Sequence, residues 1–538
     1  MKTLALLTTW SRPACVRTVL PLFGLLLALA ASPGPAAAAG DDDWPMFGQN
    51  LQNTAHAKEG VKDVARLSVK WVFTAGGDVS ARAAVVDKVA YFPDWGGNLW
   101  AVDTKNGSKV WGRKFTDYGL SATNQSRTTP AVLDGVLYLG MQEGAWLLAI
   151  DARTGKLLWK TQLETADPLA VVTTSPVVHG GRLYTGIASL QEGAAANPAF
   201  PCCSARGSVV AVSVKGANRG QIVWKTYTVP EGYSGGGVWG GNFAVDPGRG
   251  SVFVSTGNNY AHPTAPAYLA CVAGGGTAAA CQSPNNHVDA VLALDMASGA
   301  IKWASRQTNW QQPFVADGSD DWNVACLVGF APGQGNCPSN AGPDYDFASA
   351  PNLITYRDSQ GGKKTILGAG QKSGIYFAMD PDTGALLWRT QVGPGSPLGG
   401  MEWGSASDGK RIYVSIANLY GIPTGVGGAG SWSALDPATG AILWQVADPN
   451  GAISTGPVTV AGDVVFVSSM AGAPNAPTML ALNAATGQTL WSFASGASVN
   501  AGATVVDGVV FWGSGYTHLG IPGFTGNNKF YAFAKRAH

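Results

Sequence analysis

The stretch "LLAIDARTGKLLW", residues 147–159, decides the fold, because variants of it recur along the chain. Each copy has an apolar segment, a turn of the Asp-x-x-Thr-Gly type and a second segment that ends in Trp. This pattern predicts a β-hairpin. Similar segments end at Trp111, Trp303, Trp388, Trp444 and Trp491, and a looser one ends at Trp224. Internal repetition of this kind is typical of a closed array of identical units.

A second hairpin precedes most copies, as in "TTPAVLDGVLYLG" at residues 128–140. Four strands per unit predict the blade of a β-propeller. With Trp71, at the end of "LSVKW", the terminal tryptophans indicate eight blades. The last strand, "KFYAFAK" at residues 529–535, lacks a Trp-ending partner, which "LSVKW" supplies. We therefore predict an all-β fold over residues 40–538, an eight-bladed propeller with four-stranded antiparallel blades, whose N- and C-terminal strands pair and close the ring.

The spacing of the terminal tryptophans indicates where a functional site lies. We expect these tryptophans to pack between neighbouring blades rather than to contact a cofactor. The intervals are longest between Trp159 and Trp388, so the extra residues there form long loops across one face. Long loops on a rigid scaffold are where binding and catalytic residues concentrate.

The N-terminal 39 residues have the pattern of a secretory signal peptide. Lys2, Arg12 and Arg17 precede or flank an apolar run at residues 18–31, which is too short to span a bilayer, and small residues lead to a cleavage site after Ala39. The remaining chain is expected in the periplasm, without a membrane span. It keeps 32 basic and 34 acidic side chains, and only 13% of the whole sequence is charged, which excludes nucleic acid as a natural partner.

Six cysteines remain after the signal peptide, and two of them, Cys202 and Cys203, are adjacent. Neighbouring Cα atoms lie about 3.8 Å apart, closer than an ordinary disulfide prefers, so a bond between them would be strained. The other four could close two small Gly-rich loops by pairing as Cys271–Cys281 and Cys326–Cys337. That would leave the adjacent pair for each other, although six cysteines allow many pairings.

The blade repeat resembles that of the quinoprotein alcohol dehydrogenases, which use pyrroloquinoline quinone (PQQ). It equally resembles that of the non-enzymatic scaffold propeller of outer-membrane assembly. The adjacent cysteines in "PCCSARG" favour the first, since that family stacks a vicinal disulfide on one face of the quinone and a Trp on the other. The resemblance implies that Cys202 and Cys203 form this disulfide and that Trp239, in "SGGGVWGGNFAVD", is the opposite face.

The same resemblance implies a calcium site. Asn258 in "VFVSTGNNY" matches the family's Asn ligand, and Glu192 in "YTGIASLQEGA" matches its Glu ligand. Gln191 takes that position if the loop length differs. Calcium requires six to eight oxygen ligands, so cofactor atoms and Asp346 would complete the set.

The resemblance also implies the catalytic pair. Asp346 in "GPDYDFASAPNL" matches the family's base, between two aromatic residues, and Lys372 in "ILGAGQKSGIYFAMD" matches the basic residue that reaches the quinone oxygen. A competing match in "DDWNVAC" would place Asn323 at the base position. We prefer Asp346, because an amide cannot accept the proton.

The contacts to the three cofactor carboxylates follow less directly, since they require only cations, amides or hydroxyls. The candidates are Arg206, Arg82, Arg127 and Thr174. The chain departs from the family pattern at residues 453–458, "ISTGPV", where a Trp is often found. It also departs at Glu402, where an amide is often found.

The sequence excludes several other redox or hydrolytic sites: it has no Cys-x-x-Cys-His haem motif, no zinc-type His spacing, no Gly-x-Ser-x-Gly motif and no nicotinamide-binding βαβ pattern. Residues 44–55 and 343–353 look most like polyvinyl alcohol dehydrogenases. This implies PQQ- and calcium-dependent oxidation of secondary hydroxyl groups on a polymer, with electrons passed to a cytochrome c or a membrane quinone. The alternatives are oxidation of small alcohols and a non-catalytic envelope scaffold.

Overall fold

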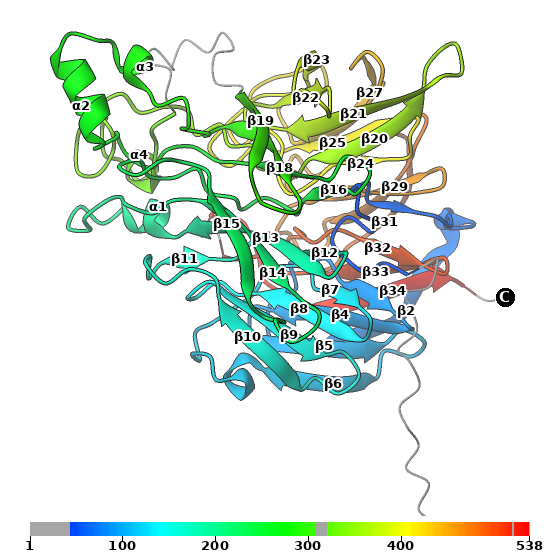
Figure 1. Ribbon diagram of the computed structural model, residues 1–538. Helices are drawn as coiled ribbons and strands as arrows, with labels where there is room; N and C mark the ends of the chain where they lie inside the picture. The colour runs from blue at the N-terminus through cyan, green and yellow to red at the C-terminus, as the bar shows by residue number, and fades with distance from the viewer. Residues whose placement is uncertain (1–42, 307–319, 519–520, 537–538) are drawn as a thin grey trace, which may run out of the picture. The chain divides into compact units, whose positions relative to one another are not determined.

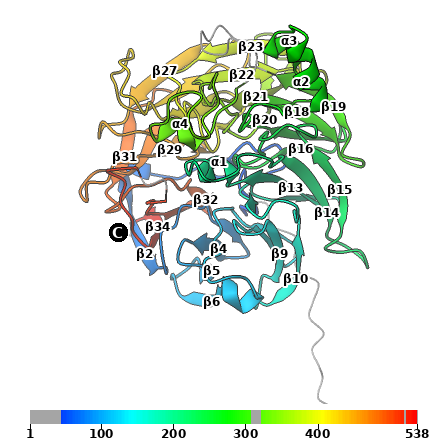
Figure 2. The ribbon, with the colours of Figure 1, turned by 90° about the vertical axis from the view of Figure 1, so that its left-hand side faces the viewer.

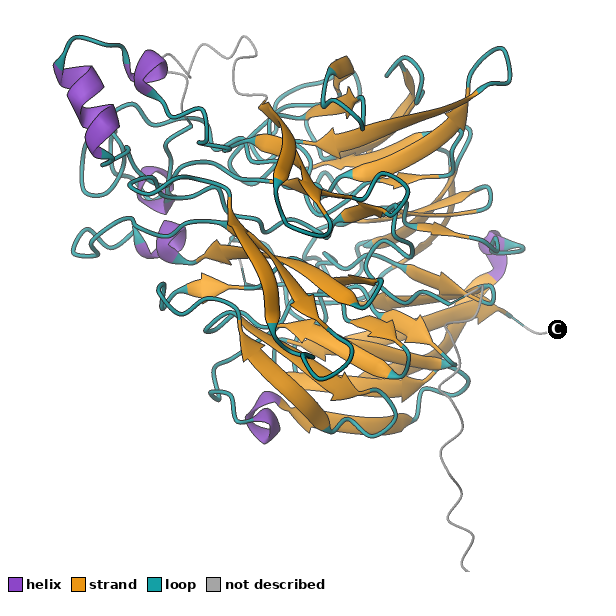
Figure 3. Ribbon diagram, viewed as in Figure 1, coloured by secondary structure: helices purple, strands orange, loops and turns teal. Residues whose placement is uncertain are grey.

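The computed structural model of the chain describes residues 43–306, 320–518 and 521–536 and contains eight β-sheets. The regular secondary structure is almost entirely strands, joined by many loops, with a few short helices (Figure 3). The predicted signal peptide lies outside the described residues. In the described ranges no helix is long and apolar enough to cross a membrane.

Seven sheets contain four consecutive strands in antiparallel order, two of these carry one extra short strand, and the eighth combines three strands from the end of the chain with one from its beginning. The first sheet contains β3 (Ala84–Val86), β4 (Val89–Asp94), β5 (Asn98–Asp103) and β6 (Lys109–Lys114), and the second contains β7 (Ala131–Leu133), β8 (Val136–Gly140), β9 (Trp146–Asp151) and β10 (Leu157–Gln162). The third contains β12 (Val177–His179), β13 (Arg182–Ser189), β14 (Ser208–Ser213) and β15 (Ile222–Tyr227), with the extra strand β11 (Ala170–Val171) paired to β13. The fourth contains β16 (Ala244–Asp246), β17 (Ser251–Ser255), β18 (Ala290–Asp295) and β19 (Ile301–Arg306).

The next three sheets repeat the arrangement. They are β20 (Asn352–Arg357), β21 (Lys363–Gly370), β22 (Ile375–Met379) and β23 (Leu386–Gln391); β24 (Ala406–Ser407), β25 (Ile412–Ile416), β26 (Ser431–Leu435) and β27 (Ile442–Ala447); and β28 (Thr459–Ala461), β29 (Val464–Ser468), β30 (Met479–Asn483) and β31 (Thr489–Phe493), with β1 (His56–Ala57) parallel to β28.

The eighth sheet joins the two ends of the described chain. It contains β32 (Thr504–Val506), β33 (Val509–Gly513) and β34 (Lys529–Lys535), followed by β2 (Leu67–Thr74). Strand β2 runs antiparallel to β34, and Trp71 pairs with Ala532. Figure 1 shows this pairing, with blue β2 beside red β34. The predicted eight-bladed propeller, closed by its terminal strands, is confirmed.

Each terminal Trp packs against the next blade, as predicted, and this shared contact accounts for the recurrence of the motif. The Trp111 indole donates to the Ala152 carbonyl at 2.8 Å, and a Cβ atom on Gly155 would lie only 2.7 Å from the Trp111 ring. Gly155 also has a φ of +69°, which favours glycine. The same Gly–Trp contact recurs at Gly107–Trp71, Gly220–Trp159, Gly299–Trp224, Gly384–Trp303, Gly440–Trp388 and Gly487–Trp444. The indole of Trp491 donates to the Leu67 carbonyl at 3.0 Å and completes the ring.

Among the described residues, four short α-helices lie in the region of the predicted long insertions. Helix α1 (Gln191–Ala194) lies in a loop of the third sheet, α2 (Pro266–Ala273) and α3 (Ala278–Cys281) lie in a loop of the fourth, and α4 (Val324–Leu327) lies between the fourth and fifth sheets. Two 3-10 turns, at Val64–Arg66 and Phe115–Tyr118, lie elsewhere. Figure 2 faces the side that carries α1 and α4, and the sheets are arranged around these two helices.

The six cysteines of the described chain form three disulfides: Cys202–Cys203, Cys271–Cys281 and Cys326–Cys337. The second bond joins α2 to α3, and the third anchors α4. The pairing inferred from spacing and from the family resemblance is therefore confirmed.

Candidate functional site

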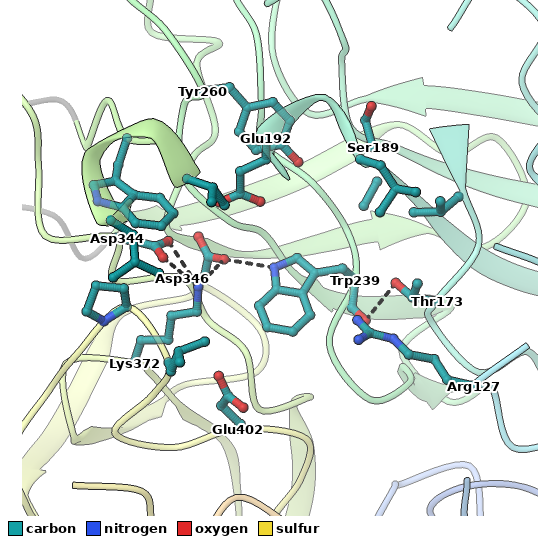
Figure 4. A pocket seen from close by; sticks show the side chains of 18 of the residues that line it. Arg127, Thr173, Ser189, Glu192, Trp239, Tyr260, Asp344, Asp346, Lys372 and Glu402 are labelled. Atoms are coloured by element: carbon teal, nitrogen blue, oxygen red, sulfur yellow. Dashed lines mark hydrogen bonds and ion pairs between the residues drawn. The ribbon is translucent and has the colours of Figure 1, made fainter. Parts of the chain in front are cut away.

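A cavity of about 230 Å³ opens beside α1 and α4. Its wall combines apolar and aromatic side chains, among them Trp239, Trp322 and Trp403, with a group of charged residues. The charged lining consists of Arg127, Glu192, Asp344, Asp346, Lys372 and Glu402 (Figure 4). These residues come from loops that are far apart in the sequence, and the propeller brings them together.

Asp346 is the most constrained residue of the cavity. It is 1% exposed, and its carboxylate receives three donors. The Trp239 indole N–H donates to Oδ2 at 2.9 Å, and the Asn258 backbone N–H donates to Oδ1 at 2.6 Å. The Lys372 Nζ lies 3.0 Å from Oδ2. Three donors from three loops fix the orientation of this carboxylate.

Lys372 lies between two carboxylates. Its Nζ donates to both oxygens of Asp344 at 3.0 Å in addition to the contact with Asp346, and it lies 5.1 Å from the centre of the Trp239 ring. Burial alone would lower the pKa of Lys372, but Asp344 and Asp346 outweigh burial and raise the pKa well above its ordinary value. The amine is therefore an ammonium ion, a fixed positive charge inside the cavity.

Asn258 does not line the cavity, but its side chain carries a buried oxygen of the kind that a cation binds. Its Nδ2 donates to the carbonyls of Asn259 and Trp322 at 2.9 and 2.8 Å. Its Oδ1 is buried and has no hydrogen-bond partner among the described residues. A buried acceptor without a donor is costly unless a ligand satisfies it.

Glu192 supplies a second oxygen group for a cation, since it lines the cavity from α1. Burial, and then the Asp346 carboxylate, raise the pKa of Glu192 to about 8, and a bound cation would relieve this. Among the described residues no three His, Cys, Asp or Glu side chains are arranged as a metal cluster. A calcium site here therefore depends on the Asn258 amide oxygen and on cofactor atoms. These oxygen donors are of the kind that calcium prefers.

Gln191 and Asn323, the alternatives to Glu192 and Asp346, make structural contacts. Gln191 is buried, and its Oε1 accepts from the backbone N–H groups of Ser204 and Ala205 at 2.8 and 3.1 Å, which holds the loop after the cysteine pair. Asn323 caps α4, because its Oδ1 accepts from the Ala325 N–H at 3.0 Å. Neither side chain lines the cavity. This geometry favours Glu192 and Asp346 over the alternatives.

The Cys202–Cys203 disulfide lies against the two helices of the cavity wall. Cys203 Sγ lies 3.9 Å from the Gln191 carbonyl, and Cys202 Sγ lies 3.8 Å from Asn323 Nδ2. The sulfur atoms themselves do not line the cavity, whereas Trp239 does. The disulfide therefore contacts α1 and the N-terminal cap of α4 but lies outside the cavity lining.

Two of the predicted carboxylate-binding arginines are directed elsewhere. Arg206 donates twice to the Val229 carbonyl, at 2.8 and 3.0 Å, and its guanidinium lies 4.0 Å from the centre of the Tyr227 ring. Arg82 is buried outside this cavity and donates to the carbonyls of Phe47 and Val458. Neither arginine lines the cavity. Both arginines donate to backbone carbonyls, a partner that sequence patterns do not reveal.

Of the other two candidates for the cofactor carboxylates, Thr174 lies outside the cavity lining and Arg127 lies within it. Thr174 donates to the Val238 carbonyl at 2.8 Å and does not line the cavity, but its neighbour Thr173 does. Arg127 lines the cavity, and its guanidinium lies 4.4 Å from the centre of the Trp403 ring. Of the four predicted residues, Arg127 alone lines the cavity, and Thr173 lines it in place of Thr174.

Three further cavity residues were missed as site residues. Asp344 lies two residues before Asp346 in the same motif, and this spacing could have indicated it. Glu402 was noted only as a departure from the family pattern. Trp403 follows it in left-handed backbone, with a φ of +57°, and packs edge-on against Trp239 with a centroid distance of 5.5 Å.

Comparison with known proteins identifies the family. A family profile described as outer membrane protein assembly factor BamB matches residues 371–510 and 428–534, within the last blades. A polyvinylalcohol dehydrogenase of Pseudomonas sp. is 30% identical over 523 residues, which cover 88% of this chain and 73% of the relative. A second one, from Sphingopyxis sp. (strain 113P3), is 27% identical and covers 90% and 74%.

A solved structure has the same fold. The quinohemoprotein alcohol dehydrogenase of Comamonas testosteroni superposes with a TM-score of 0.65 at 18% identity, over 93% of this chain and 82% of that one. The sequence matches span nearly all of the propeller, whereas the scaffold profile covers only its last part. The chain therefore belongs to the quinoprotein alcohol dehydrogenase family, with polyvinylalcohol dehydrogenases among its relatives, and is an alcohol dehydrogenase.

Proposed function

We propose that this enzyme oxidises the secondary alcohol groups of polyvinyl alcohol to ketones with PQQ and calcium. The observation that carries the proposal is the buried Asp346 carboxylate, held by three donors in a cavity beside the unsatisfied Asn258 oxygen. The substrate class comes from the named activity of the two similar proteins.

Of the residues that would hold the two groups, most line the cavity, whereas Asn258 and the Cys202–Cys203 disulfide lie outside its lining. The Trp239 indole and the Cys202–Cys203 disulfide would hold PQQ, and Arg127 and Thr173 would contact its carboxylates. Glu192, Asn258 and Asp346 would bind calcium. When bound, PQQ accepts the two electrons of the oxidation, and calcium acts as a Lewis acid.

Oxidation of a secondary alcohol removes the hydroxyl proton and a hydride from the carbinol carbon, and PQQ held by these residues would supply the hydride acceptor. Asp346 accepts the proton, because it is the carboxylate in the cavity whose orientation is fixed by the Trp239 and Asn258 N–H groups. The Lys372 ammonium, 3.0 Å from Asp346, stabilises negative charge that develops on oxygen nearby. Lys372 thereby acts electrostatically and keeps its own proton.

The mouth of the cavity suits a polymer with an apolar backbone. Leu190 and Leu327 line it and are 49% and 45% exposed. Exposed leucines beside a charged interior match a chain that alternates methylene and hydroxyl-bearing carbons. We also propose that the enzyme acts in the periplasm, after removal of residues 1–39, and delivers electrons to a cytochrome c or a membrane quinone.

The proposal is tested by adding PQQ and calcium to the purified protein and measuring dye reduction with polyvinyl alcohol and with small secondary alcohols. We expect dye reduction that requires PQQ and stops when calcium is chelated, with polyvinyl alcohol as the better substrate. A preference for small alcohols would overturn the polymer assignment. Dye reduction without PQQ would overturn the cofactor assignment.

A further inference from the structure

Glu402 is a cavity carboxylate that the proposed reaction does not use. It lies in the loop between β23 and β24, is 5% exposed and lines the cavity. Figure 4 shows it on the opposite side of the Asp346–Lys372 pair from Glu192. None of the hydrogen bonds among the described residues involves its carboxylate.

The position of Glu402 is built into the backbone. The Gly400 N–H donates to the Lys372 carbonyl at 2.7 Å, and the Met401 N–H donates to the Gln371 carbonyl at 3.2 Å, so the loop is joined to the turn that carries Lys372. Gly399 leaves room for the side chain, because a Cβ atom there would lie 2.7 Å from Glu402 Cγ. The carboxyl group is therefore held beside the cavity by fixed backbone contacts.

The charge balance of the cavity is unfavourable for an anionic ligand. Four carboxylates and two cations line it. Lys372 is already paired with Asp344 and Asp346, and Glu192 faces the proposed calcium site. Glu402 then shares Lys372 with these two carboxylates and depends on Arg127, the cation that a cofactor carboxylate would also require. A tricarboxylate in this cavity would be repelled by an ionised Glu402.

We propose that Glu402 is a neutral carboxylic acid when the cofactor is bound and donates a hydrogen bond to it, so that cofactor binding takes up one proton. This inference rests on the proposed function, because it concerns the same cavity and the same cofactor. A neutral acid removes the repulsion, and its O–H supplies a donor toward an anionic ligand. An amide could donate in the same way, but only the acid makes the affinity depend on pH.

The groups that face Glu402 support this protonation state. Burial raises the pKa of Glu402 to about 7, Lys372 and Arg127 oppose the increase, and Asp346 adds to it. Tyr516, whose pKa is also raised by burial, is the other titratable neighbour. The free protein therefore changes the charge of Glu402 near neutral pH, and an anionic cofactor would shift this equilibrium further toward the acid.

Two titrations of the full-length mature protein with PQQ, in saturating calcium, test the inference. Calorimetry at pH 8, in buffers of different ionisation enthalpy, counts the protons taken up, and tryptophan fluorescence gives the Kd at pH 6 and pH 8. For the wild type we expect uptake of about one proton and a Kd about tenfold weaker at pH 8 than at pH 6. Glu402→Gln should take up about one proton fewer and bind equally well at both pH values.

The exposed Glu231 provides the matched control, since Glu231→Gln removes a glutamate charge outside the cavity and should behave as the wild type. Equal proton uptake by the wild type and Glu402→Gln would overturn the inference. If Glu402→Gln does not fold, the absence of proton uptake by the wild type at pH 8 overturns it. Binding of PQQ without a Glu402-dependent proton refutes this inference alone, whereas a failure of all variants to bind PQQ refutes the proposed function as well.

Discussion

The Gly–Trp contacts between blades and the charged cavity are both buried, but they are built in opposite ways. The contact between Gly155 and Trp111 is apolar, joins neighbouring blades and recurs around the ring. The Asp346 cluster occurs once, contains buried charges and unites loops separated by 107 residues at Trp239 and 88 residues at Asn258. The first arrangement stabilises the fold through repetition. The second concentrates unfavourable burial of charge where chemistry requires it.

The largest expected effect is a loss of activity when a charged residue of the cavity is changed. Asp346→Asn should lower kcat about 10²–10⁴-fold, since the amide cannot accept the hydroxyl proton. Dye reduction by the PQQ- and calcium-loaded variant measures this loss. Asp448, which is 3% exposed and lies outside the cavity lining, is the matched control, and Asp448→Asn should retain its activity. A kcat of the Asp346→Asn enzyme within tenfold of the wild-type value would refute the role of Asp346 as the base.

The second effect is on stability and concerns the repeat. Gly155→Ala should lower the free energy of unfolding by about 3 kcal/mol, because it adds strain at positive φ and a clash with Trp111. Gly508 is the matched control, with a φ of +70° and no atom within 4 Å of the position that a Cβ would take, so Gly508→Ala should cost about 1 kcal/mol. Urea unfolding compares the two variants. Equal costs would contradict the proposed role of the Trp contact.

The third effect is the pH dependence of the free protein. The pKa of Glu402 is raised from an ordinary value of 4.5 to about 7, so the unfolded chain releases this proton first as the pH rises. The wild type therefore keeps this stability below pH 4.5 and loses it as the pH rises through about 7, by up to about 3 kcal/mol. Glu402→Gln should lack this loss. Thermal unfolding of the wild type and of Glu402→Gln at pH 5 and pH 8 measures this difference. Parallel changes of stability with pH in the two proteins would contradict the prediction.

The smallest expected effects distinguish a disulfide that contributes to cofactor binding from one that contributes to stability. The Cys202–Cys203 bond closes almost no loop, so replacing both cysteines with Ser should barely change the unfolding temperature but weaken PQQ binding about tenfold. Replacing Cys271 and Cys281, which close a longer loop between α2 and α3, should cost about 2–3 kcal/mol and leave PQQ affinity unchanged. The reverse pattern would show that the adjacent cysteines are structural.

The fold could be predicted well from the sequence because the information is local and repeated. One hairpin motif contains its own turn, its terminal Trp and the Gly that packs on the previous blade, so every copy indicates the same unit. The ring closure also followed, since "LSVKW" and "KFYAFAK" each lacked the strand that the other supplies.

The site was predictable only where a motif carried the residue. Asp346, Lys372, Trp239, Asn258 and Glu192 were predicted from local resemblance. Four of them line the cavity, and Asn258 contacts Asp346 through its backbone N–H. The roles of Arg206, Arg82 and Thr174 depended instead on distant backbone carbonyls that accept their hydrogen bonds, at Val229, Phe47 and Val238. No local pattern indicates such partners. Glu402 was missed as a site residue for a related reason, since its importance arises from the charges around it.

The central claim is that the cavity beside Asp346 holds the quinone and the calcium ion. A crystal structure of the protein loaded with PQQ and calcium tests it most directly. We predict the quinone between the Trp239 indole and the Cys202–Cys203 disulfide, with calcium about 2.3–2.6 Å from Asn258 Oδ1. Calcium bound elsewhere, with the Asn258 oxygen still unsatisfied and the indole not stacked on the quinone, would contradict it.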